Sequence, residues 1–370
     1  MVPFLPNLDL QILFTFLSLR FQFTNQWPAM SERCERDSSE LPTGSDATVI
    51  LERTLSLRSV ISTTSSFSQL AQTSRNRPHL QQINQIGAGS QGVVFERAGK
   101  DSVLKKERPG NEILSSNLTK EYTIHRRVSA AFDHYQPLTK CETIVPKGST
   151  ALEITVLMQR ILPLPKVVRR ALIHHFITAD IPQASALLAD PRNKHCLARV
   201  YLGKENGALS HESPLRNFPL YLDDMKRIGI DTIELTSALG KAYATLHWGA
   251  GVNGDDIEFV LGTTVEQAVC GRQPHEDRAI GLFLLDFGQC DIVDLSQESG
   301  TVYQAFKGAM LSGDNQHFIP HANQPELFAA FKKGYSAAGT IILGDKRLDS
   351  KFDMKEFVQQ YEEYAEDFVS

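Results

Sequence analysis

Cysteine is scarce and scattered in this sequence. The 370 residues contain five cysteines, and they share no common spacing: Cys34, Cys141, Cys196, Cys270 and Cys290. They form no C-x-x-C pair and no pattern with paired histidines, so the sequence signals neither a zinc site nor a disulfide framework. A chain without such a framework belongs by default to a reducing compartment, and we expect an intracellular protein, cytoplasmic or nuclear.

Long apolar runs are also missing. The most apolar stretch, Ile12–Leu19, is cut by Arg20 and is too short to span a bilayer, so no stable membrane span is expected. It is also a poor secretory signal, because Asp9 stands where a basic segment belongs and no small-residue cleavage site follows. We interpret residues 1–29 as an over-extended or poorly ordered start, with Met30 as the true initiator. A weak membrane anchor is the competing interpretation.

Positive charge is not in excess. Lys and Arg number 38 against 43 Asp and Glu, the net charge is −5, and no basic block occurs. This balance argues against a general nucleic-acid binder. From Ser31 to Arg77 the chain is rich in Ser, Thr, Arg and Glu, and Ile61–Phe67 is typical of a flexible linker. We therefore expect residues 1–78 to be a disordered or poorly ordered extension and residues 79–370 to form the domain.

A glycine-rich stretch, GAGSQGVVF, lies near the start of this expected domain. Gly87, Gly89 and Gly92 match G-x-G-x-x-G, a pattern that brings backbone close to phosphate and that two unrelated folds share. A dinucleotide-binding loop would run into a helix. Here Val93–Glu96 and Ser102–Lys106 flank a short turn and predict a β-hairpin instead. A plain glycine-containing hairpin without a ligand is the alternative interpretation.

Val94 extends the pattern to G-x-G-x-x-G-x-V, the loop that covers the nucleotide phosphates in protein kinases. In that fold the following strand carries a lysine toward the phosphates. On a period of two, Val103 and Lys105 share one face, and Ser102–Lys105 overlays the V-A-I-K pattern. Lys105 is therefore the candidate phosphate ligand, and a solvated lysine on an edge strand is the alternative.

A helix with an inward carboxylate is predicted next. In Asn117–Phe132, apolar residues such as Leu118 and Ile124 recur at helical spacing, and Glu121 falls on the same stripe. A carboxylate on a buried face needs a partner, and Lys105 is the partner that the kinase fold provides. The alternative is that Glu121 lies at the edge of the stripe and pairs with a base of its own helix.

An apolar strand leading into a proline-rich connector is typical of the hinge between two lobes. Ile154–Ile161 predicts a buried strand, and the connector is Leu162–Pro165. The backbone near Gln159 and Ile161 would then meet the edge of an adenine. A core strand that simply ends at a proline predicts the same residues.

The later half supplies a metal-binding candidate. A capping box beginning at Asp231 predicts a helix that ends at His247, followed by a glycine-rich loop and the strand Ile257–Leu261. A polar insertion around residues 271–278 precedes a second strand, which ends in Asp286-Phe-Gly. An aspartate at this place holds magnesium against phosphate oxygens in kinases, so Asp286 is a candidate magnesium ligand.

Two stretches resemble a fungal family of unknown function that is sometimes labelled a zinc-finger-protein domain. They are LHWGAGVNGDDIEFVLG, from Leu246 to Gly262, and NKHCLARVYLG, from Asn193 to Gly203; the resemblance covers residues 80–339. The cysteines give the zinc label no support, and we expect no zinc. The family is similar to the protein-kinase-like superfamily. This implies an α+β fold of two lobes, a small antiparallel β N-lobe (about 79–162) and a mainly α C-lobe (about 163–370). The family itself carries over no chemistry; ATP and Mg are expected from the glycine loop, Lys105 and Asp286.

The sequence departs from the kinase pattern in the catalytic loop. H-R-D-x-x-x-x-N provides a proton acceptor and a metal-binding asparagine. Counted from His247, the acceptor position holds Gly249; counted back from the next strand it holds Gly251, with Asp256 in the asparagine position. Neither alignment supplies a base.

Three residues of this loop are the substitutes for the missing catalytic groups. Asn253, Asp255 and Asp256 are the candidate catalytic residues, and Asp256 is also a candidate metal ligand together with Asp286. The alternative is that Asn253–Asp256 forms only a turn. Glu258 alternates with a phenylalanine in the following strand, and we expect it to face away from the site.

The platform for peptide substrates is the last missing part. No A-P-E motif follows Gly288, and the remaining chain predicts helices beginning near Asn323 and spanning Phe352–Phe368. Phosphorylation of proteins is therefore the least favoured activity. The preferred hypothesis is a pseudokinase or nucleotide-binding interaction module, with an unidentified protein partner. The alternative is an active Mg-ATP-dependent phosphotransferase that acts on a small molecule.

Overall fold

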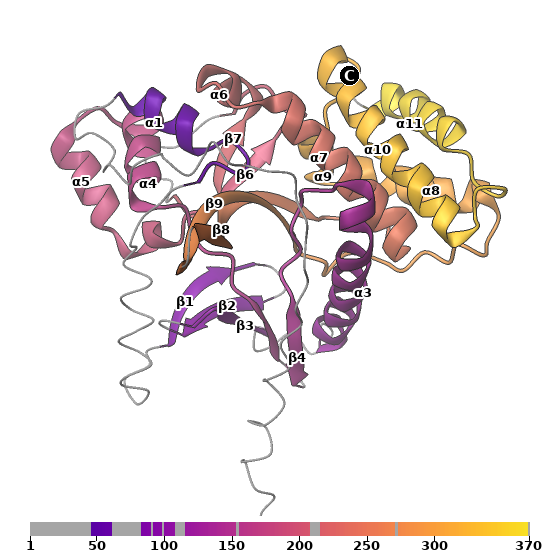
Figure 1. Ribbon diagram of the computed structural model, residues 1–370, viewed down its shortest axis with the longest axis horizontal. Coiled ribbons are helices and arrows are strands. Elements are labelled where there is room, and N and C mark those ends of the chain that lie inside the picture. Colours follow the sequence, from indigo (N-terminus) through magenta and orange to yellow (C-terminus); the bar gives the residue numbers. More distant parts are fainter. Residues whose placement is uncertain are drawn as a thin grey trace, which may run out of the picture. The chain divides into compact units, whose positions relative to one another are not determined.

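The computed structural model describes residues 46–60, 83–89, 92–97, 100–107, 115–152, 155–207, 215–270 and 273–368. Within these ranges, an antiparallel sheet with one long helix is followed by a mainly helical part that contains a second sheet (Figure 1). The predicted flexible linker at residues 61–67 and the proposed initiator Met30 lie outside the described residues. No helix in the described ranges combines the length and the apolar composition that crossing a bilayer requires.

The first sheet contains the predicted hairpin. Its strands are β1 (Ile83–Ala88), β2 (Gly92–Arg97), β3 (Ser102–Glu107), β4 (Gly148–Leu152) and β5 (Thr155–Gln159). All pairs are antiparallel, and the order is β1-β2-β3-β5-β4. Val103 and Lys105 are buried whereas Lys106 is exposed, as the period of two predicts. The strand β2 therefore follows the glycine loop, which confirms a hairpin rather than a helix.

The predicted carboxylate-bearing helix is α3 (Ser115–Thr139), which is longer than expected. Its apolar stripe is buried, including Leu118, Ile124 and Val128. The helix packs on β4 and β5. It also packs on parts of the chain more than a hundred residues away, the segment after α7 (Thr232–Ala244) and the helix α10 (Pro325–Lys346). It therefore joins the first sheet to the helical part.

The helical part has a close-packed core. Its helices are α4 (Lys166–Leu172), η4 (Ile173–Ile177), α5 (Ile181–Ala189), η5 (Pro191–His195), α6 (Leu222–Arg227), α7 (Thr232–Ala244), η6 (Thr245–Ala250), α8 (Ser299–Leu311), α9 (Asn315–Phe318), α10 (Pro325–Lys346) and α11 (Met354–Phe368). The helix α7 begins at the predicted cap, where the Asp231 carboxylate accepts from the Glu234 N–H at 2.9 Å. Fully buried aromatic side chains, Trp248 and Phe306 among them, fill the interior.

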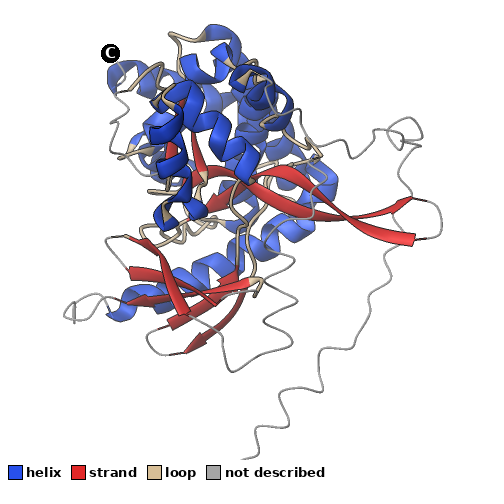
Figure 2. Cartoon of the chain, turned by 90° about the vertical axis from the view of Figure 1, so that its left-hand side faces the viewer, coloured by secondary structure: helices blue, strands red, loops and turns tan. Residues whose placement is uncertain are grey.

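A second sheet lies within the helical part, and the sequence indicated only half of it. Its strands are β6 (Ala198–Tyr201), β7 (Phe218–Tyr221), β8 (Glu258–Cys270) and β9 (Gln273–Leu285), in the order β7-β6-β8-β9. Most of the predicted polar insertion at residues 271–278 is strand rather than loop. The strands β8 and β9 pair from Glu258 opposite Leu285 out to Cys270 opposite Gln273, and Figure 2 shows them as a long twisted hairpin.

The N-terminal extension needs a correction. Residues 46–60 are described and contain the helix α1 (Ala47–Thr54), which packs on α4 (Figure 1). Leu51 and Leu55 are fully buried in the main core. Burial of these side chains supplies the free energy that orders the helix despite its polar surroundings. This part of the predicted poorly ordered extension, residues 1–78, therefore belongs to the folded core.

The predicted fold class is confirmed. The chain has a kinase-like α+β fold, with a small antiparallel N-lobe sheet and a mainly helical C-lobe. The segment after β5 connects the lobes. It also pairs with β8, where the Thr263 N–H donates to the Leu162 carbonyl at 2.8 Å. This connection brings β3, α3 and the C-terminal end of β9 together.

Candidate functional site

The predicted lysine and glutamate meet in a buried ion pair. Lys105 Nζ, on β3, lies 2.7 Å from Glu121 Oε1 and 2.8 Å from Oε2, on α3. Both side chains are almost buried, at 11% and 6% exposure. Removing one partner from such a pair would leave an uncompensated buried charge. The interpretation of Lys105 as a solvated edge-strand residue is therefore wrong, and so is the interpretation of Glu121 as a partner of its own helix.

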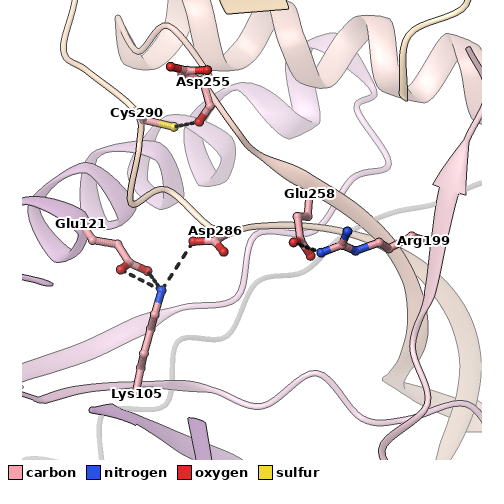
Figure 3. A network of polar contacts seen from close by, with 7 residues as sticks. All are labelled: Lys105, Glu121, Arg199, Asp255, Glu258, Asp286 and Cys290. Carbon is pink, nitrogen blue, oxygen red and sulfur yellow. Dashed lines mark hydrogen bonds and ion pairs between the residues drawn. The ribbon is translucent and has the colours of Figure 1, made fainter. Parts of the chain in front are cut away.

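Asp286 joins this pair from the C-lobe. It follows β9 directly, and its Oδ1 lies 3.4 Å from Lys105 Nζ (Figure 3). Burial alone would lower the pKa of Lys105, but the charges of Asp286 and Glu121 outweigh this effect and raise it. The lysine is therefore a fixed positive charge. Its side chain is held between the two lobes, where it can contact a phosphate group bound beside Asp286.

The glycine loop has the close backbone packing that its pattern predicts. Gly89 N–H donates to the Gly92 carbonyl at 2.9 Å, and Gly87 pairs with Val94 across β1 and β2. A Cβ at Gly92 would lie 2.7 Å from the Lys106 carbonyl oxygen, so a side chain cannot fit there without backbone movement. The tip of the loop, residues 90–91, lies outside the described residues. That these glycines cover the phosphates of a nucleotide stays a prediction.

The two hinge candidates differ in what their backbone can offer. The Gln159 N–H already donates to the Lys147 carbonyl at 2.7 Å, so it is not free to contact a base. Ile161 lies against β8, where a Cβ at Gly262 would approach Ile161 Cγ2 to 2.5 Å. The Gln159 N–H is therefore excluded as a base contact, whereas the adenine contact of Ile161 stays a prediction.

The segment after α7 is fixed from within the C-lobe. His247, on η6, stacks on Phe306 with ring centres 4.2 Å apart, and its nitrogens contact Tyr335 Oη at 2.8 Å and the Asn253 carbonyl at 3.2 Å. A carbonyl can only accept, so Nε2 carries the proton and Nδ1 accepts from Tyr335. Burial lowers the pKa of His247 to about 3. The histidine is therefore a neutral structural group that anchors the loop.

Two of the three candidate catalytic residues are hydrogen-bonded to backbone and side-chain groups of the C-lobe. Asn253 Oδ1 accepts from the Asp291 N–H at 2.8 Å and from the Asp255 N–H at 3.3 Å. The Asp255 carboxylate accepts a hydrogen bond from Ser312 Oγ, and Figure 3 shows it pointing away from Asp286. The interpretation of this stretch as a structural turn describes both side chains well.

Asp256 is the exception, because its side chain is exposed to solvent. Burial and then the charge of Asp286 raise its pKa, so the two carboxylates are within electrostatic reach. Both residues have positive φ, 54° for Asp256 and 65° for Asp286, a region that aspartate adopts more readily than most residues.

The residues present fit a magnesium ion only if a bound nucleotide supplies some of its ligands. Within the described part of the chain, no group of three His, Cys, Asp or Glu side chains could hold a metal. Magnesium in kinase sites is held by one or two carboxylates together with substrate phosphates and water. Asp286 and Asp256 provide such a pair, so the donor set fits a metal that arrives with a nucleotide rather than a resident ion.

Sequence reasoning missed a second ion pair, between Arg199 on β6 and Glu258 on β8. Burial raises the pKa of Glu258 to about 7; Arg199 opposes the rise, and Asp286 and Asp256 add to it. Figure 3 shows Glu258 beside Asp286, so the expectation that it faces away from the site was wrong. The signal was present: Phe259 faces the core, which places its neighbour on the opposite face of the strand.

No protein-family model and no curated protein matches the chain. Two solved structures of the Rio2 kinase from Chaetomium thermophilum are similar to it. The complex with ADP/Mg²⁺-phosphoaspartate is 15% identical and covers 80% of this chain and 75% of that chain, with a TM-score of 0.25. The second structure is 15% identical and covers 77% of this chain and 79% of that chain, with a TM-score of 0.24.

Proposed function

We propose that this protein binds a magnesium–nucleotide complex in a kinase-like site and acts as a pseudokinase, an interaction module rather than a protein kinase. The observation that carries the proposal is the meeting of Lys105, Glu121 and Asp286, which come from three elements far apart in the sequence. Burying a lysine against two carboxylates costs desolvation free energy, so such a cluster is weak evidence for a stabilising role and favours a functional one. Contact with phosphate is the use that this fold makes of such a lysine.

The loop supports binding over phosphoryl transfer. A general base must reach the hydroxyl whose proton it accepts, directly or through one water. Asn253 and Asp255 already bond to neighbours within the C-lobe, and Asp256 is shared with the proposed metal site. This leaves no carboxylate in the loop that is free for proton transfer alone. Bound nucleotide would then act as the ligand that sets the state of the protein for a partner.

A thermal-unfolding experiment tests the proposal. Mg-ATP at a large excess over Kd should raise Tm of the wild-type protein by several degrees, because a ligand at 100 times Kd contributes about 2.7 kcal/mol. Lys105→Ala and Asp286→Asn should abolish the shift, measured for each variant against its own ligand-free Tm. Lys106→Ala is the matched control, since Lys106 is exposed on the opposite face of β3 and should leave the shift unchanged. A wild-type protein that shows no shift, or a shift that survives both substitutions, would contradict the proposal.

A small-molecule phosphotransferase is the second candidate, and the exposure of Asp256, within electrostatic reach of Asp286, favours it. The same protein preparations distinguish the two functions. Consumption of ATP with any compound of a metabolite panel, lost in Asp256→Asn while the Tm shift persists, would identify an enzyme. A Tm shift without ATP consumption supports the interaction module.

A further inference from the structure

Two arginines of the C-lobe carry charges that no acid balances. Arg169, on α4, donates from Nε to the Leu164 carbonyl at 3.1 Å and from Nη1 to the Asn193 carbonyl at 3.0 Å, so both of these partners are neutral. Arg216, in the segment before β7, has a buried Nε without a hydrogen-bond partner. Within the described part of the chain, neither guanidinium forms an ion pair with an acid.

Asn193, on η5, brings the two arginines to the same part of the C-lobe. This residue is fully buried. Its carbonyl accepts from Arg169, and its Oδ1 accepts from the Leu215 N–H, next to Arg216, at 2.6 Å. Its Nδ2 donates to the Leu187 carbonyl at 2.8 Å. Asn193 therefore fixes the Arg169 side chain and the backbone next to Arg216.

His195, on the same short helix, lies within electrostatic reach of both guanidiniums. Burial lowers the pKa of His195; the charge of Glu96 opposes this effect, and the charges of Arg160, Arg216 and Arg169 add to it. Arg160 Nη2 lies 3.4 Å from His195 Nδ1, and a guanidinium can only donate, so Nδ1 accepts and the ring is neutral. Glu96 forms its ion pair with Arg160, at 2.5 Å. The charges of Arg169 and Arg216 therefore remain in excess.

The energetics of protonation show the same lack of a balancing acid. Burial lowers the pKa of Arg169, and the group that opposes this effect is the thiol of Cys196. Burial raises the pKa of Cys196 to about 12, so this thiol is neutral at physiological pH and cannot balance the guanidinium. Lys105 shows the opposite result, because its two acids outweigh its burial and raise its pKa. A bound anion would supply the negative charge that Arg169 lacks.

We propose that Arg169 and Arg216 form a binding site for a phosphate group, separate from the nucleotide site. A guanidinium presents paired donors that match the oxygens of phosphate, and a phosphate dianion balances both arginines, which a single carboxylate does not. The strand β5 separates the two sites. Val156 pairs with Lys105, and Arg160, which contacts His195, follows four residues later, about 13 Å along the strand. The inference therefore does not depend on nucleotide binding.

Calorimetric titration of nucleotide-free protein with inorganic phosphate, at constant ionic strength, tests the inference. Wild-type protein should bind one phosphate ion per chain. Arg169→Gln and Arg216→Gln should each weaken this affinity roughly tenfold or more, because each removes a charge-assisted contact. Arg192→Gln is the matched control: Arg192 lies on η5 as well, but its side chain is 70% exposed and pairs with Asp190, so phosphate affinity should not change.

The stability of Arg216→Gln separates a binding role from a structural one. Arg216 has no partner to lose within the described residues, and its removal reduces repulsion with Arg169. In phosphate-free buffer the Tm of this variant should therefore equal or exceed that of wild type. A clear fall in Tm together with unchanged phosphate affinity would assign Arg216 a structural role and overturn the inference.

A second titration identifies the source of the phosphate. Tighter binding of a phosphoserine-containing pentapeptide than of inorganic phosphate would assign the site to a phosphorylated protein segment, and weaker binding would assign it to the free ion. No saturable binding of either probe by wild-type protein would overturn the inference. Loss of phosphate binding in Lys105→Ala would also overturn it, because the ion would then lie in the nucleotide site. Failure of Mg-ATP to bind would count against the proposed function alone.

Discussion

Lys105 shows how single residues define this site. Its ammonium is buried, and three direct contacts with Glu121 and Asp286 compensate for the lost hydration. Loss of either carboxylate would weaken this compensation. The side chain therefore has one orientation, set by an acid from the N-lobe and an acid from the C-lobe. Any closure or opening between the lobes changes the distance from Lys105 to Asp286 before it changes the pair with Glu121.

His247 provides a pH-dependent prediction at the same scale. Its pKa is about 3 in the folded protein, against about 6.5 when unfolded, so between these values the unfolded chain binds a proton that the folded chain does not. The free energy of unfolding therefore falls as pH drops from about 6.5 toward 3, by up to about 1.4 kcal/mol per pH unit from this residue. Urea unfolding at pH 5 and pH 7 should show a smaller difference for His247→Gln than for wild type. Equal differences in the two proteins would contradict this role.

At the scale of elements, α7 and α10 cross with backbones in close contact. A Cβ at Gly334 would lie 2.5 Å from the Ser237 carbonyl oxygen, and one at Gly240 would lie 2.3 Å from that of Phe331. Gly334→Ala should therefore lower the free energy of unfolding by roughly 1–3 kcal/mol, because the helices must separate. Gly344→Ala on the same helix meets nothing within 4 Å and should leave stability unchanged or raise it by up to about 1 kcal/mol. Chemical denaturation of both variants checks this, and equal effects would contradict the packing argument.

Elements with strong local patterns could be predicted from the sequence. The hairpin β2–β3, α3 and α7 each have a period or a cap that is complete within one segment. The strands β6 and β7 are four residues long, too short for a periodic signal, and they form because β6 pairs with β8 and β7 pairs with β6. The helix α1 lies in a polar stretch of the sequence. Its few apolar residues become part of a core only because α4 packs against them. The elements that the sequence did not predict are therefore stabilised by tertiary contacts, which no local sequence pattern encodes.

In the whole molecule, the site residues also divide into those that the sequence predicts and those that depend on tertiary contacts. Motif order was enough to predict Lys105, Glu121 and Asp286, because the kinase fold places them by topology. The pair of Arg199 and Glu258 depends on the register of β6 against β8, which the sequence does not state. The folded unit also includes residues before the glycine loop: Arg58 pairs with Glu142, and Val60 bridges to Ala279 on β9. The N-terminal segment thus covers one edge of the second sheet, a position that otherwise exposes unpaired backbone groups.

The most direct measurement of the central claim is the Kd for ATP with and without Mg²⁺, in wild-type protein and in Asp286→Asn. If Lys105, Glu121 and Asp286 form one phosphate and metal site, Mg²⁺ should tighten ATP binding to wild-type protein about tenfold or more, a difference of about 1.4 kcal/mol. The substitution removes the metal-binding charge, so Mg²⁺ should then have little effect on the affinity. No ATP binding by wild-type protein at saturating Mg²⁺, or the same Mg²⁺ dependence in both proteins, would contradict the account.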